Sequence, residues 1–146
     1  MDTDILKKRI SFAGKLTKFF YNYFNSKLDL KKLQETYKAD KGRITRLDLT
    51  DINVSIHFRL KNGKFEILKN VNKPDNIILA PSDMYFSLFE KEHDAIIQEM
   101  MTRWRFGEIS FFGETAMADF KLFIKAIKDL KDSLPKIKQE AVLQSA

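Results

Sequence analysis

The chain contains no cysteine among its 146 residues. Disulfides, thiolate nucleophiles and cysteine-based zinc sites are therefore excluded. Two histidines are present, His57 and His93, so a zinc site built from side chains alone would need carboxylates to complete it. These absences remove many thiol-dependent and metal-dependent enzymes from consideration, and we expect neither a bound metal nor a cofactor.

Glycine is also scarce, and its spacing excludes the familiar phosphate-binding loops. The five glycines are Gly14, Gly42, Gly63, Gly107 and Gly113. A Gly-x-Ser-x-Gly nucleophile turn is absent as well. Asp48 and Asp51 flank a predicted turn, where aspartate is common for backbone reasons. Because no nucleophile, acid and base come together, we expect a protein that is not an enzyme.

Long apolar runs are missing too. None approaches the ~18 residues needed to span a bilayer. Residues 1–4 are acidic and polar, and Lys7, Lys8 and Arg9 interrupt the apolar residues that follow, unlike a secretory signal. The final Leu-Gln-Ser-Ala is not a peroxisomal Ser-Lys-Leu address. We expect one cytoplasmic domain over residues 1–146, with N-terminal helices in 1–42, a sheet-and-helix core in 43–132 and a tail from 133.

The net charge of +6 lies mostly at the two ends of the chain. Residues 1–51 carry +5, residues 52–114 carry −1 and residues 115–146 carry +2. This distribution favours an anionic membrane surface or an acidic partner over a nucleic-acid groove. We therefore expect possible peripheral membrane contact, no nucleic acid, and a monomer or homodimer.

Aromatic side chains are abundant, with 13 Phe, 4 Tyr and 1 Trp. Rings fill protein cores and also line apolar pockets, and composition does not separate the two uses. Methionine adapts to irregular apolar shapes and has the same two interpretations. Residues 4–27 read as an amphipathic helix that either packs on the core or touches a membrane. Its apolar stripe is Leu6, Ile10, Ala13, Leu16, Phe20 and Phe24.

A weaker helix is expected over 28–42, ending at Gly42. The period then changes to two, which predicts strands. They cover residues 44–49, 53–60, 64–67, 76–80 and 108–112, with a tight hairpin at Asn62-Gly63. Because residues 76–80 are continuously apolar, we expect that strand to be covered on both faces.

Further helices are expected from Ser82, from Asp94 and over 115–132, with Ser82 and Asp94 as N-caps. The tail from 136 is expected to be frayed or disordered. Strands that pair through a tight hairpin, with helices inserted later, predict an α+β fold.

Three motifs between residues 51 and 130 resemble the sterol carrier protein type-two family of lipid-binding domains. They are the hairpin of residues 53–69, the segment Asn76-Ile-Ile-Leu-Ala-Pro-Ser-Asp83, and Gly107-Glu-Ile-Ser-Phe-Phe-Gly113. The resemblance implies a five-stranded, mostly antiparallel sheet covered on one face by helices, with an apolar tunnel between the layers. It also implies non-covalent binding of a sterol, fatty acid, fatty acyl-CoA or phospholipid without a cofactor.

Carried over by resemblance, the lipid-binding candidates lie on the hairpin, the last strand and three helices. They are Val54, Ile56, Phe58, Met84, Leu88, Met100, Met101, Trp104, Phe111, Phe112, Met117, Phe120 and Ile124. Trp104 and Phe106 are bulkier than the family pattern, so they could partly fill the tunnel. This leaves an alternative: an accessory or interaction module with a filled pocket, acting through its aromatic N-terminal helix as a partner-binding or dimerisation surface.

Overall fold

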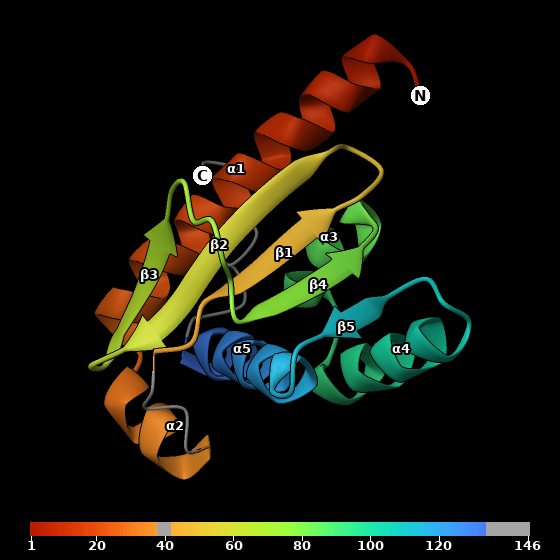
Figure 1. Cartoon of the computed structure of the whole chain (residues 1–146). Helices are drawn as coiled ribbons and strands as arrows, with labels where there is room; N and C mark the ends of the chain where they lie inside the picture. The colour runs from red at the N-terminus through yellow and green to blue at the C-terminus, as the bar shows by residue number, and fades with distance from the viewer. Residues whose placement is uncertain (38–41, 134–146) are drawn as a thin grey trace.

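A five-stranded sheet lies at the centre of the computed structural model, which describes residues 1–37 and 42–133. Residues 38–41 of the second predicted helix and the predicted tail beyond 133 lie outside the described residues. Gly42, the predicted end of that helix, has a positive φ of +66°. The elements in chain order are α1 (Thr3–Lys27), α2 (Leu30–Tyr37), β1 (Thr45–Leu49), β2 (Val54–Lys61), β3 (Lys64–Leu68), β4 (Asn76–Ala80), α3 (Ser82–Glu90), α4 (His93–Arg105), β5 (Ser110–Phe112) and α5 (Ala116–Ser133) (Figure 1).

The strands are arranged in the order β3-β2-β1-β4-β5. Strands β1 and β4 pair in parallel, and the other three pairs are antiparallel. The hairpin is confirmed at Asn62-Gly63, where both residues have positive φ, +52° and +73°, as a tight two-residue turn requires. The predicted α+β class with a mostly antiparallel sheet is therefore confirmed.

Helices α1, α3 and α5 cover one face of the sheet, and no described helix lies across the other face (Figure 1). Alternation along β2 directs Ile56 and Phe58 toward the helices, as predicted. The expectation that β4 is covered on both faces is wrong. Its residues alternate between buried and half-buried, because Ile77 and Leu79 point to the uncovered face.

The start of α3 differs from the prediction that Ser82 is its N-cap. Ser82 is already the first helical residue, and the side chain of Asp51, in the β1–β2 turn, accepts hydrogen bonds from its backbone N (2.7 Å) and its Oγ (2.6 Å). Arg9 of α1 also binds Asp51, at 3.2 Å. Burial raises the pKa of Asp51, but the Ser82 hydrogen bonds and the Arg9 charge outweigh it and hold that pKa below its ordinary value. One carboxylate thus joins α1, the turn and α3.

Helix α4 also begins earlier than predicted. It starts at His93 with Glu92 in the N-cap position, so the predicted cap, Asp94, lies in the first turn. There its negative charge still favours the positive end of the helix dipole.

Helix α1 packs on the core along most of its length. Thr17 Oγ1 lies 2.6 Å from the hydroxyl of Tyr85 in α3, and burial raises the pKa of that phenol. The side-chain amide of Asn25 donates to the carbonyl of Phe65 and accepts from its N–H, both at 2.9 Å. Since β3 is an edge strand, Asn25 occupies part of its open hydrogen-bonding edge. Among the described residues, no helix has both the length and the apolarity to cross a membrane.

Phenylalanine rings from four elements form the centre of the core. Phe123 of α5 is the hub, with ring centroids 5.1 Å from Phe58, 5.4 Å from Phe20, 5.6 Å from Phe24 and 5.8 Å from Phe65. Most of these pairs are edge-to-face or tilted, geometries that add roughly 0.5–1.5 kcal/mol per pair beyond the burial of area. The layers are therefore joined mainly by rings.

Two glycines make a matched test of backbone packing. A Cβ at Gly113 would lie 2.3 Å from Asn76 Oδ1 and 2.7 Å from Asp75 O, at a φ of +113°. Gly113→Ala should therefore lower the free energy of unfolding by about 2 kcal/mol or more in urea titrations. A Cβ at Gly14, within α1, meets nothing within 4 Å, so Gly14→Ala should raise stability by about 0.5–1 kcal/mol. Equal effects of the two variants would contradict the packing described.

The ring hub has its own test. Phe123→Ala should destabilise the fold by about 3–5 kcal/mol, because the surrounding rings cannot close the cavity completely. Phe106 is 78% exposed, so Phe106→Ala should change stability by no more than about 0.5 kcal/mol. Urea unfolding followed by circular dichroism measures both, and a mild effect at Phe123 would show that the hub is not central.

Candidate functional site

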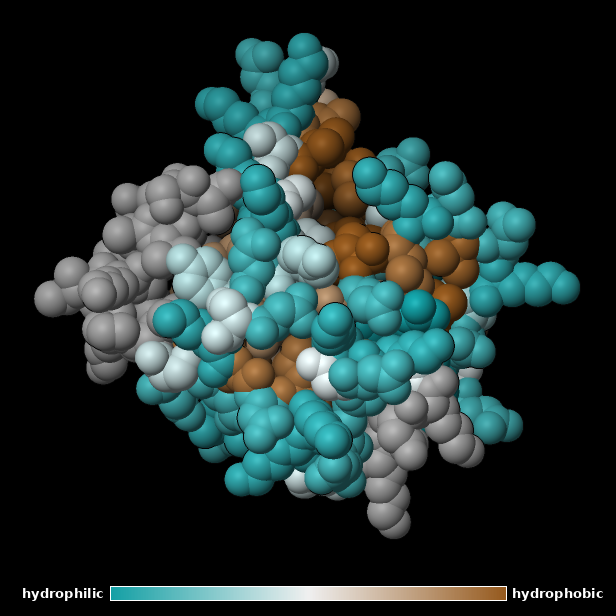
Figure 2. Space-filling view, turned by 90° about the vertical axis from the view of Figure 1, so that its left-hand side faces the viewer, coloured by the Kyte–Doolittle hydropathy of each residue, from teal (hydrophilic) through white to brown (hydrophobic). Residues whose placement is uncertain are grey.

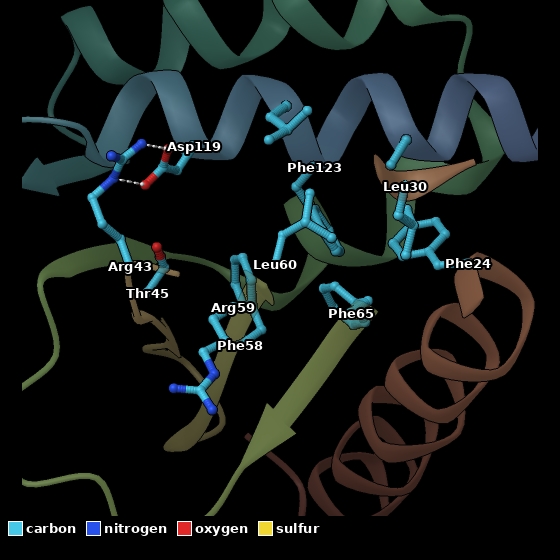
Figure 3. Close-up of a pocket in the computed structure, with 12 residues that line it drawn as sticks. Phe24, Leu30, Arg43, Thr45, Phe58, Arg59, Leu60, Phe65, Asp119 and Phe123 are labelled. Carbon is cyan, nitrogen blue, oxygen red and sulfur yellow. Dashed lines mark hydrogen bonds and ion pairs between the residues drawn. The ribbon is translucent and has the colours of Figure 1, made fainter. Parts of the chain in front are cut away.

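A small apolar space lies between α5 and the β2–β3 hairpin, beside the phenylalanine hub (Figure 3). It is lined by Phe24, Leu30, Arg43, Thr45, Phe58, Arg59, Leu60, Phe65, Asp119, Leu122, Phe123 and Ala126. Its volume of ≈ 40 Å³ is enough for a few waters. Pockets that enclose a drug-sized ligand measure about 300–1,000 Å³. In this conformation the rings therefore fill the room that a lipid would need.

The two ends of this space differ in polarity. Arg43 and Asp119 lie at one end, and Phe24 and Leu30 lie at the other (Figure 3). The guanidinium of Arg43 donates to both carboxylate oxygens of Asp119, at 3.0 and 2.9 Å. Asn76 and Thr115 donate to the same carboxylate, at 2.9 and 3.1 Å. The charges at this end are paired, so the space has a polar end and an apolar end.

The predicted lipid-binding residues are mostly placed elsewhere in the fold. Phe58 lines this space. Other candidates are buried in the core outside its lining: Ile56, Met84, Leu88, Met100, Phe120 and Ile124. A third group is half-buried against the core: Val54, Met101, Phe111 and Met117.

The last two candidates are exposed. Trp104 is 42% exposed and Phe112 is 54% exposed. Phe112 is paired with Ile77 in the β4–β5 register, so it points to the uncovered face of the sheet while Phe111 faces α5. The expectation that Trp104 and Phe106 fill the interior is also wrong, because phenylalanines from α1, β2, β3 and α5 fill it instead.

Sequence reasoning missed several residues that line the space. Phe65 carried a usable signal, because the hairpin register places it opposite Leu60 on the helix-facing side. On α5, the second apolar stripe of Leu122, Phe123 and Ala126 was the signal, since it shows a helix buried on more than one side. The Arg43–Asp119 pair carried none, because its members are separated by 76 positions.

The described residues contain no group of three or more His, Asp or Glu side chains arranged to hold a metal ion. The ionised groups nearest the apolar space are those already paired, Arg43 with Asp119 and Arg59 with Glu66. The geometry therefore suits non-covalent binding by burial of apolar surface.

Comparison with known proteins gives a family and a fold. A family model described as the SCP-2 sterol transfer family matches residues 23–103. A solved structure titled "UbiJ-SCP2 Ubiquinone synthesis protein" is similar over 92% of this chain and 99% of its own, with a TM-score of 0.62 and 14% identity. "Sterol Carrier Protein 2 from Yarrowia Lipolytica (apo form)" is similar over 80% of this chain and 90% of its own, with a TM-score of 0.50 and 14% identity. A search of curated protein sequences found no match.

At such low identity the two structures support the fold alone. The family match is independent of them and spans more than half of the sequence, including the hairpin, the Ser82-Asp83 helix start and most of α4. On this evidence the chain belongs to the SCP-2 sterol transfer family.

Proposed function

We propose that the protein is a non-enzymatic lipid-binding or lipid-transfer protein that holds an apolar tail between the β2–β3 hairpin and α5. The observation that supports the proposal is the amphipathic space itself, with an apolar wall leading to the paired Arg43 and Asp119. The family is named for sterol transfer, and one structural neighbour is titled a ubiquinone synthesis protein. The ligand classes to test are therefore sterols, fatty acids, fatty acyl-CoA, phospholipids and prenylated quinones.

Binding requires the hub to rearrange, because ≈ 40 Å³ does not admit a lipid tail. Each methylene removed from water contributes about 0.8 kcal/mol, so ten methylenes contribute roughly 8 kcal/mol. This is larger than the few kcal/mol associated with displacing one ring from its partners. A tail can therefore take the place of a ring such as Phe123, and the ring can pack against the tail instead.

We also propose that the protein is cytoplasmic and docks on anionic membranes. Helix α1 carries Lys7, Lys8, Lys15 and Lys18, all exposed. A well-placed lysine near an anionic leaflet contributes about 1 kcal/mol.

Filling the space should prevent binding. Ala126→Leu adds three carbon atoms at the wall of a space of ≈ 40 Å³, so it should weaken binding of a fluorescent fatty acid or sterol at least about tenfold. Ala118→Leu, on the exposed side of the same helix, should leave affinity unchanged. Both variants are measured after delipidation, and native mass spectrometry of gently purified wild type should show co-purified lipid. No binding to the wild type by any of the five lipid classes would refute the proposal.

A second candidate function is favoured by the small interior volume. In this case the fold is an interaction module that uses α1 to bind a partner or a second copy. The N-terminal end of α1 extends beyond the sheet (Figure 1), and Figure 2 shows hydrophobic side chains exposed below that end. Ile5 is 49% exposed and Ile10 is 41% exposed.

This candidate predicts self-association through α1. The double variant Ile5→Glu, Ile10→Glu should then be monomeric at concentrations where the wild type forms dimers in sedimentation experiments. Ser11→Glu, exposed on the same helix, serves as the charge control. A wild type that remains monomeric over the same concentrations would exclude dimerisation by this surface.

A further inference from the structure

Helix α2 closes the apolar end of the interior space. Its first residue, Leu30, lines that space beside Phe24, at the end opposite Arg43 and Asp119 (Figure 3). A lipid tail that lies along the space would therefore have one end against α2.

Few side chains hold α2 in place. Leu30 and Leu33 are buried, at 3% and 8% exposure. Gln34 is 5% exposed, and its side-chain amide donates to the carbonyl of Leu60 at 3.3 Å and accepts from the N–H of Gly63. Because Leu60 also lines the interior space, Gln34 connects α2 to the strand that bounds the site.

The other side of α2 faces a hollow. A space of ≈ 300 Å³ separates it from α5. The lining residues are Leu28, Asp29, Lys32, Leu33, Thr36, Lys125 and Asp129. A helix of eight residues has little stability of its own, and segments with few buried contacts open at a low free energy. Leu28, which joins α1 to α2, has extended backbone angles (φ −112°, ψ 148°), so the two helices are separate segments.

We propose that α2 is a lid, and that the lipid tail enters and leaves the interior space when this lid opens. The inference rests on the proposed lipid-binding function. Helix α2 swings about residues 28–29, the hydrogen bonds of Gln34 to Leu60 and Gly63 break, and Leu30 withdraws from the wall. The tail then passes between α2 and the hairpin, and Gln34 rejoins Leu60 and Gly63 when α2 closes.

An engineered disulfide can hold this lid closed. A Cβ built at Gly63 lies 3.3 Å from Cβ of Lys31, near the ~3.8 Å that joins the Cβ atoms of a disulfide. Since the chain has no cysteine, the double variant Lys31→Cys, Gly63→Cys can form one disulfide, from α2 to the hairpin turn. The reduced form of the same variant is its matched control.

Oxidation should slow the uptake of a fluorescent fatty acid at least about tenfold relative to the reduced form, measured by stopped flow. Equal uptake rates in the oxidised and reduced forms, with binding intact, would overturn only the proposal that α2 is the lid. If neither the wild type nor the reduced form binds the fatty acid, the proposed function is overturned, and the proposal that α2 is a lid is overturned with it.

A second measurement covers the strain of placing cysteine at Gly63, where φ is +73°. Gln34→Met keeps the length of the side chain but removes its hydrogen bonds to Leu60 and Gly63, so uptake should become faster by about tenfold. In the unliganded wild type, amide hydrogens of α2 should exchange faster than those of α5. Exchange in α2 as slow as in α5, or unchanged uptake in Gln34→Met, would overturn the inference.

Discussion

The structure depends on the contact of phenylalanine rings between α5 and the β2–β3 hairpin. Phe123 meets Phe24, Phe58 and Phe65 there, so the same rings hold the layers together and line the small apolar space between them. Core stability and ligand capacity therefore oppose each other. Under the proposed function, a tail is accommodated at the expense of ring contacts, and its own burial must replace them.

The charged groups around the phenylalanine hub are paired with one another, so a movement of the rings would not leave a charge unpaired. The carboxylate of Asp119 has Arg43, Asn76 and Thr115 as donors at the polar end. Asp51 joins α1 to α3 by a similar arrangement beyond the other end of β1. Paired charges of this kind are costly to break, so the proposed rearrangement is expected at the apolar end, where α2 is held by neutral hydrogen bonds.

The sequence predicted the strands, the hairpin and the fold class because periodicity and the Asn62-Gly63 turn are local signals. The residues of the site were harder to predict, because the residues that line an interior space depend on which apolar faces of the helices and strands pack together. Met100 and Ile124 are on buried helix faces, as expected, yet neither lines the interior space. Arg43 and Asp119 come together only when β1 and α5 are packed. The predicted N-caps, Ser82 and Asp94, were wrong for different reasons. The backbone N–H of Ser82 is bound by Asp51, 31 positions away, and α4 already starts at His93.

Asn25 has a consequence for how copies of this protein meet. Its side-chain amide pairs with both backbone groups of Phe65 and stands in for a neighbouring strand on the outer side of β3. A sheet edge left open is a template for joining another sheet, and polymers grow when both edges are open. Here one edge is partly occupied by α1, and the other, β5, is three residues long. Continuous sheet-to-sheet polymerisation is thus disfavoured.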